Sequence, residues 1–166
     1  MEKIPPLVLL FHSFPEAVLL GLAGLVLVGV KPKFEKAIYY GILQTVVAYF
    51  IRQLNVPLGT HTLLLIPCVT LFLSKLNEIR IKKALVAALL GLILVIFAEG
   101  FFVSLVLNHT TLTLESIMAP ENALLRVLVA TPQMLFLGMV AFASYRLRRF
   151  HLTEYRVSRG LKYGRY

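Results

Sequence analysis

The sequence has few charged residues, and this shortage excludes an ordinary soluble domain. Charged residues make up 15% of the 166 positions and hydrophobic residues 58%, and the mean hydropathy is +0.82. A soluble domain carries about 25% charged residues. Because a small domain buries only part of its surface, so many apolar side chains cannot be hidden in one core. We therefore expect lipid to surround most of the chain.

Cysteine and recognisable catalytic motifs are also scarce. The one cysteine is Cys68, so an intrachain disulfide is excluded. No motif indicates catalytic residues, a metal site or a cofactor, and the sequence favours a non-enzymatic protein. The net charge of +9 does not indicate nucleic-acid binding, since the basic residues stand at the ends of apolar runs.

The apolar residues form continuous runs, such as 84–98, which indicate membrane helices. A transmembrane β-barrel would instead show short segments of alternating hydrophobicity. We therefore predict an all-α, polytopic integral membrane bundle in residues 1–145, followed by a basic tail, 146–166. Five transmembrane helices are expected at about 15–30, 37–52, 60–75, 84–107 and 123–145.

Two segments outside these helices carry their own predictions. Residues 4–14 contain Pro5 and Pro6, and they are expected to be either an interfacial lead-in or an irregular first part of the span that begins near Pro15 and Glu16. The polar stretch between the last two helices is expected to hold a short amphipathic helix at 114–118.

The distribution of lysine and arginine predicts the orientation. The turn at 31–36 has three of these residues, the turn at 75–83 has four and the tail has seven, whereas the opposite side has only Lys3, Arg52 and Arg126. Cytoplasmic segments carry the excess of positive charge. The prediction is an N-terminus outside and a C-terminus in the cytoplasm.

Polar residues inside apolar spans are the main indication of function. Such groups are costly in lipid and usually face a bundle interior or a wet cavity. Five of them crowd the outer half of the predicted bundle and form a candidate ligand site: Glu99, Arg126, Arg52, His61 and Gln133. Glu99 should lie about 12 Å below the outer surface, where Arg126 or Gln133 can approach it. The alternative is structural, with the arginines snorkelling to the interface.

Small residues recur at helical spacing in two of the predicted helices. Gly21 and Gly24 lie in the first, and the fourth has Ala84 with Ala88 and Ala87 with Gly91. Such residues allow two helices to approach closely.

Several short stretches are similar to a known family. They are 13–16 (SFPE), 29–32 (GVKP), 49–54 (YFIRQL), 56–62 (VPLGTHT) and the intramembrane Glu99. Together they resemble the N-terminal multi-helix membrane sensor region of Gram-positive sporulation- and quorum-type sensor histidine kinases, and related stand-alone small membrane proteins. No phospho-acceptor or ATP-binding domain follows Tyr166, so the resemblance implies the sensor part alone.

Three functions remain open from the sequence. The preferred one is a non-enzymatic sensory or regulatory module of the cell membrane with an outward polar pocket. The second is a small transporter or substrate-binding subunit. The third is a membrane thiol peptidase using His61 and Cys68, which lie two helical turns apart, about 10 Å along one helix.

The expected partners follow from the same segments. They are the lipid bilayer, anionic lipid at the basic tail and a cytoplasmic or membrane signalling partner, with no nucleic acid.

Overall fold

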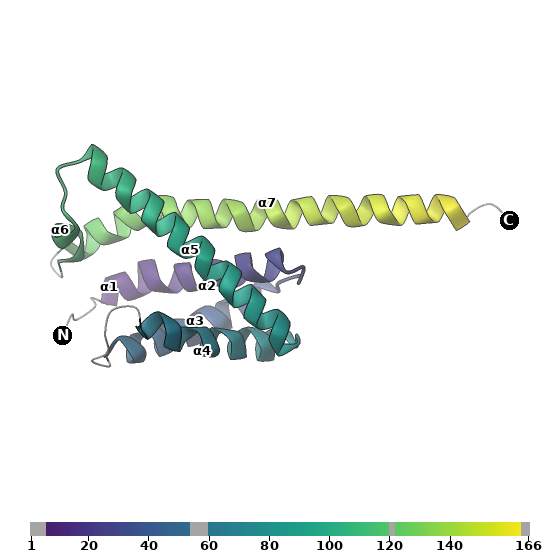
Figure 1. Cartoon of the computed structure of the whole chain (residues 1–166), viewed down its shortest axis with the longest axis horizontal. Helices are drawn as coiled ribbons and strands as arrows, with labels where there is room; N and C mark the ends of the chain where they lie inside the picture. Colours follow the sequence, from purple (N-terminus) through teal and green to yellow (C-terminus); the bar gives the residue numbers. More distant parts are fainter. Residues whose placement is uncertain (1–5, 54–59, 120–121, 164–166) are drawn as a thin grey trace.

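The computed structural model describes residues 6–53, 60–119 and 122–163, and all regular structure in these ranges is helical (Figure 1). The elements in chain order are α1 (Pro6–Val8), η1 (Leu9–Ser13), α2 (Phe14–Leu27), α3 (Phe34–Gln53), α4 (Thr60–Asn77), α5 (Ile81–His109), α6 (Leu114–Met118) and α7 (Ala123–Tyr163). No strand occurs in the described ranges, which confirms the all-α class.

Four helices are long and apolar enough to cross a membrane. These candidate spans are Leu9–Leu27, Thr60–Asn77, Ile81–His109 and Ala123–Arg146. The chain thus has the features of a multi-pass membrane protein. The helix between the first two spans, α3, has 20 residues but is not among the four. It carries buried Gln44 and Thr45, which make it less apolar than its neighbours.

The first helix begins earlier than the prolines predict. α1, η1 and α2 follow one another from Pro6 to Leu27, and η1 is a π-helical turn in which the Phe14 N–H bonds the Leu9 carbonyl oxygen. Pro15 has no N–H and its ring crowds the preceding turn, and the wider π turn provides room for it. The regular α-helix thus begins at Phe14, near the predicted start at Pro15, and residues 6–13 form an irregular helical portion that precedes it. Residues 4 and 5 lie outside the described part.

α2 ends at Leu27 rather than at the predicted residue 30. Gly29 adopts the left-handed conformation with φ 82°, and the Val30 N–H bonds the Leu25 carbonyl oxygen at 2.9 Å. A 6→1 bond of this kind, with glycine in the left-handed position, terminates a helix.

α2 lies at the centre of the bundle, where it packs against α3, α5 and α7. Of its span, 44% is buried, against 22–28% for the other three. Glycines make this crowding possible. A Cβ added to Gly24 would overlap the backbone carbonyl oxygen of Ala87, and one added to Gly91 would lie 2.8 Å from that of Leu20. The close helix approach predicted from the small residues is confirmed.

α5 crosses the bundle diagonally (Figure 1). Its 29 residues correspond to about 43 Å, more than the roughly 30 Å of a bilayer core. It starts beside the end of α4 and crosses α7 further along, where Phe102 packs on Phe136 with ring centroids 6.0 Å apart. α6 then reverses the chain, and its bounds match the predicted short helix at 114–118.

α7 is far longer than predicted. It continues from Ala123 to Tyr163 over 41 residues and extends beyond the rest of the bundle (Figure 1). The predicted span at 123–145 agrees with the candidate span Ala123–Arg146, but the helix does not end there, and no proline interrupts the stretch that follows. The basic tail is a continuation of the last span through Tyr163.

The turn between α4 and α5 is tied to α3 by an ion pair. Lys36 Nζ donates to Glu78 Oε1 at 2.9 Å. Glu78 sits in the left-handed region with φ 55°, and the Ile79 N–H bonds the Ser74 carbonyl oxygen across it at 3.1 Å. The pair joins the two basic turns at one end of the bundle.

The α2–α5 contact predicts opposite effects for two glycine substitutions. Gly24→Ala should lower the stability by about 1–3 kcal/mol, because overpacking forces backbone displacement. Gly100→Ala is the control, since no atom lies within 4 Å of its added Cβ, and it should gain up to about 1 kcal/mol of helix propensity. Thermal unfolding in detergent measures both, and equal stabilities would contradict the tight crossing.

The Lys36–Glu78 pair predicts a pH-dependent contribution to stability. The hydrogen bond from Lys36 and its positive charge hold the pKa of Glu78 below its ordinary value. A carboxyl with a lowered folded-state pKa stabilises the fold above its unfolded pKa, and this contribution is lost as the pH falls through the folded value. Lys36→Met should lower the Tm slightly at neutral pH, and the difference from the unmodified protein should vanish below about pH 4. Lys82→Met serves as the control, and a pH-independent difference for Lys36→Met would contradict the linkage.

Candidate functional site

The end of the bundle opposite the two basic turns, which the sequence predicts to be the outer end, contains a partly buried hydrogen bond between two helices. Gln133 Nε2 of α7 donates to Glu16 Oε1 of α2 at 2.9 Å. Gln133 is 2% exposed and the Glu16 side chain is 18% exposed. Each residue directly follows a proline, Pro15 or Pro132, and prolines disturb a helix locally. The two helices therefore meet through polar side chains that each follow a proline.

A second polar contact and several charges surround this hydrogen bond. His12 Nε2, one turn before Glu16, lies 3.7 Å from Glu16 Oε2. Arg52 from α3 and Arg126 from α7 act electrostatically on both His12 and Glu16, and Glu99 from α5 acts on Glu16. Four parts of the bundle thus bring ionisable groups toward one carboxyl. We call His12, Glu16, Gln133, Arg52, Arg126 and Glu99 the outer cluster.

Four of the five residues predicted for the ligand site belong to the outer cluster, but in different roles. Gln133 is central, Arg126 is half-buried, and Arg52 and Glu99 are exposed. The Gln133 amide donates to Glu16, and no hydrogen bond between Gln133 and Glu99 is found among the described residues. Within the described ranges, Glu99 and the two arginines have no ion-pair partner.

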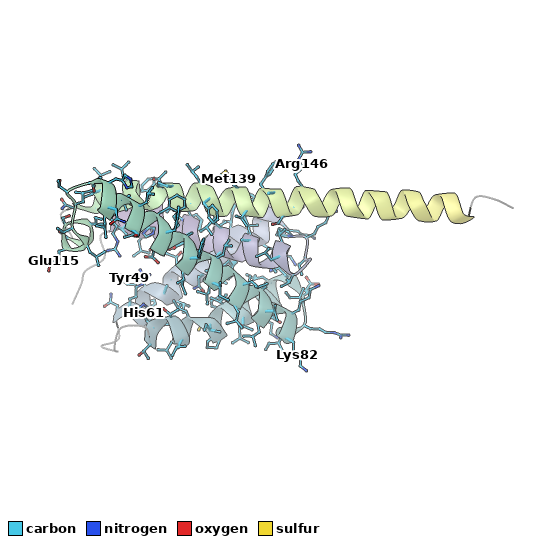
Figure 2. All side chains as sticks on the ribbon, turned by 45° about the horizontal axis from the view of Figure 1, so that its top comes forward. Tyr49, His61, Lys82, Glu115, Met139 and Arg146 are labelled. Atoms are coloured by element: carbon cyan, nitrogen blue, oxygen red, sulfur yellow. The ribbon has the colours of Figure 1, made fainter. Side chains whose placement is uncertain are left out.

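His61 does not join the outer cluster. It lies in the first turn of α4, half-buried, and makes no hydrogen bond or ion pair with any described residue (Figure 2). α4 is continuous from Thr60 to Asn77 despite Pro67, so the two-turn spacing between His61 and Cys68 is kept. A thiol–imidazole pair needs hydrogen-bond reach, and this geometry does not supply it.

Sequence reasoning missed His12, and it placed Glu16 at the outer end of its helix without including it in the ligand site. The two lie at i and i+4, a spacing that places side chains on one helical face. The i, i+4 spacing of His12 and Glu16 can be read from the sequence, but it places them on one face only if a single helix runs through residues 12–16. The prolines at 5, 6 and 15 indicated an interruption instead, and the π turn that accommodates Pro15 has no sequence signature of its own.

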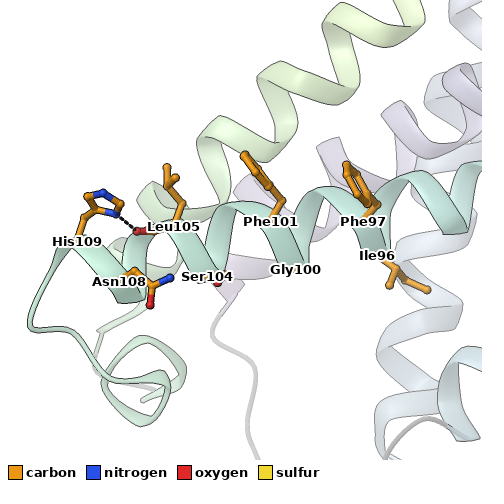
Figure 3. Close-up of a pocket in the computed structure, with 8 residues that line it drawn as sticks. All are labelled: Ile96, Phe97, Gly100, Phe101, Ser104, Leu105, Asn108 and His109. Carbon is orange, nitrogen blue, oxygen red and sulfur yellow. Dashed lines mark hydrogen bonds between the residues drawn. The ribbon is translucent and has the colours of Figure 1, made fainter.

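A hollow of about 520 Å³ lies on α5 and is lined by none of the outer cluster residues (Figure 3). Its lining comes entirely from this one helix: Ile96, Phe97, Gly100, Phe101, Ser104, Leu105, Asn108 and His109. The His109 ring is held by the Leu105 carbonyl oxygen, with Nδ1 at 2.9 Å. A depression with a single helix as its wall offers no convergent polar groups, so we do not assign the function to it.

The Glu16–Gln133 hydrogen bond predicts coupling between the two positions. A double-mutant cycle with Glu16→Leu and Gln133→Leu should give a coupling energy of about 1 kcal/mol, as for interhelical hydrogen bonds in membranes. Thr131→Val is the matched control on α7, because the Thr131 hydroxyl donates to Val127 of its own helix. Unfolding in detergent measures the cycle. Additive effects of the Glu16 and Gln133 substitutions would show that the bond does not hold the helices together.

Comparisons with family models, with curated proteins and with solved structures find no match for this chain. Its function must therefore be inferred from the outer cluster and from the helices that carry it.

Proposed function

We propose that the protein is a non-enzymatic sensory or regulatory module of the cell membrane. Its ligand site is the outer cluster, open to the outside, and its output is α7. The proposal includes five membrane crossings, with α3 as the fifth, an N-terminus outside and the basic end of α7 in the cytoplasm.

The lengths and charges of the helices support this topology. α3 has 20 residues, enough for about 30 Å of bilayer core, and it packs between α2 and α4. Both turns rich in lysine and arginine lie at the end of the bundle from which α7 extends (Figure 1). Arg52 and Arg126 lie at the other end, together with the outer cluster. One basic end and one sparsely charged end are the pattern of cytoplasmic and outer sides.

The observation that carries the proposal is the Glu16–Gln133 hydrogen bond. It joins the central helix, α2, to α7, and α7 continues without interruption from Gln133 to Tyr163. A ligand that competes for Glu16 would release Gln133 and change how α7 packs on α2. A continuous helix transmits such a shift or rotation to its far end. The ligand site at Gln133 and the basic end that gives the output thus lie on one continuous helix, α7.

The unpaired charges supply groups for the ligand. Arg52, Arg126 and Glu99 surround the bond and lack ion-pair partners among the residues that the structure describes. A polar ligand carrying both an acidic and a basic group would complement them. At the opposite end, the arginines and lysines of the segment after residue 145 suit anionic lipid and a signalling partner. This division of roles is the one that the resemblance to kinase sensor regions implies.

Spin labels at the basic end test the coupling between the outer cluster and α7. The labels are placed at Lys82→Cys and Arg146→Cys (both labelled in Figure 2) in a Cys68→Ser background. Glu16→Leu and Gln133→Leu should each shift the distance distribution between the labels in nanodiscs, because α7 loses its tether to α2. Glu115→Gln, an exposed residue of α6 outside the outer cluster, should leave the distribution unchanged. Unchanged distributions in both cluster variants would refute the proposed output.

Uptake measurements separate the sensor from the small transporter. A sensor changes the packing of α7 without net flux, whereas a transporter moves solute across reconstituted vesicles. Flux of a labelled solute that is abolished by Glu16→Leu would replace the sensory proposal with transport.

A further inference from the structure

α3 buries three polar side-chain atoms that have no hydrogen-bond partner among the described residues. They are the Tyr40 hydroxyl, Gln44 Oε1 and the Thr45 hydroxyl. Tyr40 is 1% exposed, Gln44 6% and Thr45 7%. A buried polar group without a partner costs about 1–3 kcal/mol, so three such groups on one helix require an explanation.

Other polar residues in the spans do have hydrogen-bond partners. The Thr70 hydroxyl donates to the Ile66 carbonyl oxygen at 2.8 Å, and that of Thr131 donates to Val127 at 2.9 Å. These bonds to the preceding turn are how threonine is normally satisfied in a membrane helix. Gln133 is satisfied by Glu16. Thr45 and Gln44 therefore differ from their counterparts on α4 and α7.

The three residues occupy the buried stripe of α3 that faces α2 and α4. The Tyr40 ring fills the notch at Gly21, where an added Cβ would lie 2.5 Å from Cε1. Gln44 follows one turn further along the helix, on the same face as Tyr40, and Thr45 is next to it. Arg52 of the outer cluster lies two turns beyond Gln44, about 12 Å along the axis. The buried row thus continues inward from the outer cluster.

We propose that Tyr40, Gln44 and Thr45 line an internal hydrated pocket that admits water and small hydrogen-bonding solutes. Ordered water satisfies buried polar groups when about two to four partners surround it, and the row offers two hydroxyls and an amide. Polar residues inside membrane spans mark wet cavities and solute paths. The pocket explains why α3, which is not among the four most apolar spans, nevertheless buries a polar stripe. It is independent of the sensory role proposed for the outer cluster.

Thiol accessibility tests the pocket directly. Single cysteines at Gln44 and at Thr45, in a Cys68→Ser background, are exposed in proteoliposomes to a charged methanethiosulfonate reagent, 2-aminoethyl methanethiosulfonate. Only the thiolate reacts, and it forms only where water is present. Val46→Cys is the matched control, because Val46 is adjacent on α3 and 47% exposed toward the lipid side of the bundle.

The expected order of reaction rates is the opposite of the order of exposed fractions. Gln44→Cys and Thr45→Cys should react about tenfold faster or more than Val46→Cys, although Val46 is the exposed residue, because lipid suppresses thiolate formation. Reaction rates at 44 and 45 as low as at 46, from both sides, would overturn the proposal.

Conservative removal of the hydroxyls gives a second measurement that does not require cysteine variants to fold. If the pocket is dry, Thr45→Val and Tyr40→Phe delete unsatisfied groups and should raise the Tm by a few degrees. If water satisfies the hydroxyls, the same substitutions remove hydrogen bonds and should lower the Tm by a similar amount. A lower Tm supports hydration, and a rise contradicts it.

Discussion

Lipid offers no hydrogen bonds, and this constraint determines where the polar groups of the protein lie. In a bilayer, each polar atom must find its partner within the protein or in enclosed water. The backbone is satisfied by helices, and Thr70 and Thr131 by the preceding turn of their own helix. The side chains that helical bonds cannot satisfy gather between helices, as Glu16 and Gln133 do. The outer cluster therefore depends on an apolar surround that leaves its members few other partners.

Packing decides which polar groups can meet. α2 contacts α5 backbone to backbone at Gly24 and Gly91, which fixes the crossing point of the two helices. Because α5 runs diagonally from that point (Figure 1), its outer half and the start of α7 come together near the outer end of α2. Larger residues at the crossing would separate α2 from α5, and Glu99 would move away from Glu16. The glycine contact between α2 and α5 thus positions Glu99 relative to Glu16.

Much of this architecture could be predicted from the sequence, and the exceptions share a physical cause. Apolar runs and basic turns located the helices, and small residues at helical spacing, Gly21 with Gly24 and Ala87 with Gly91, indicated that their helices approach a neighbour closely, although not which one. Composition could not reveal that η1 absorbs Pro15, nor that α7 continues past residue 145. Both depend on backbone hydrogen bonds across several residues. The partner of Gln133 was also hidden, since Glu16 and Gln133 are 117 positions apart.

The satisfied and unsatisfied polar groups call for different explanations. The Glu16–Gln133 bond satisfies both side chains and stabilises the contact between α2 and α7. Tyr40, Gln44 and Thr45 have no such benefit if they are dry, because apolar residues of similar shape would fill the same space at lower cost. Groups that lower stability without compensation are typical of functional sites. The buried row on α3 is therefore the stronger sign that this bundle does more than cross the membrane, and the charges around Glu16 lie at its outer end.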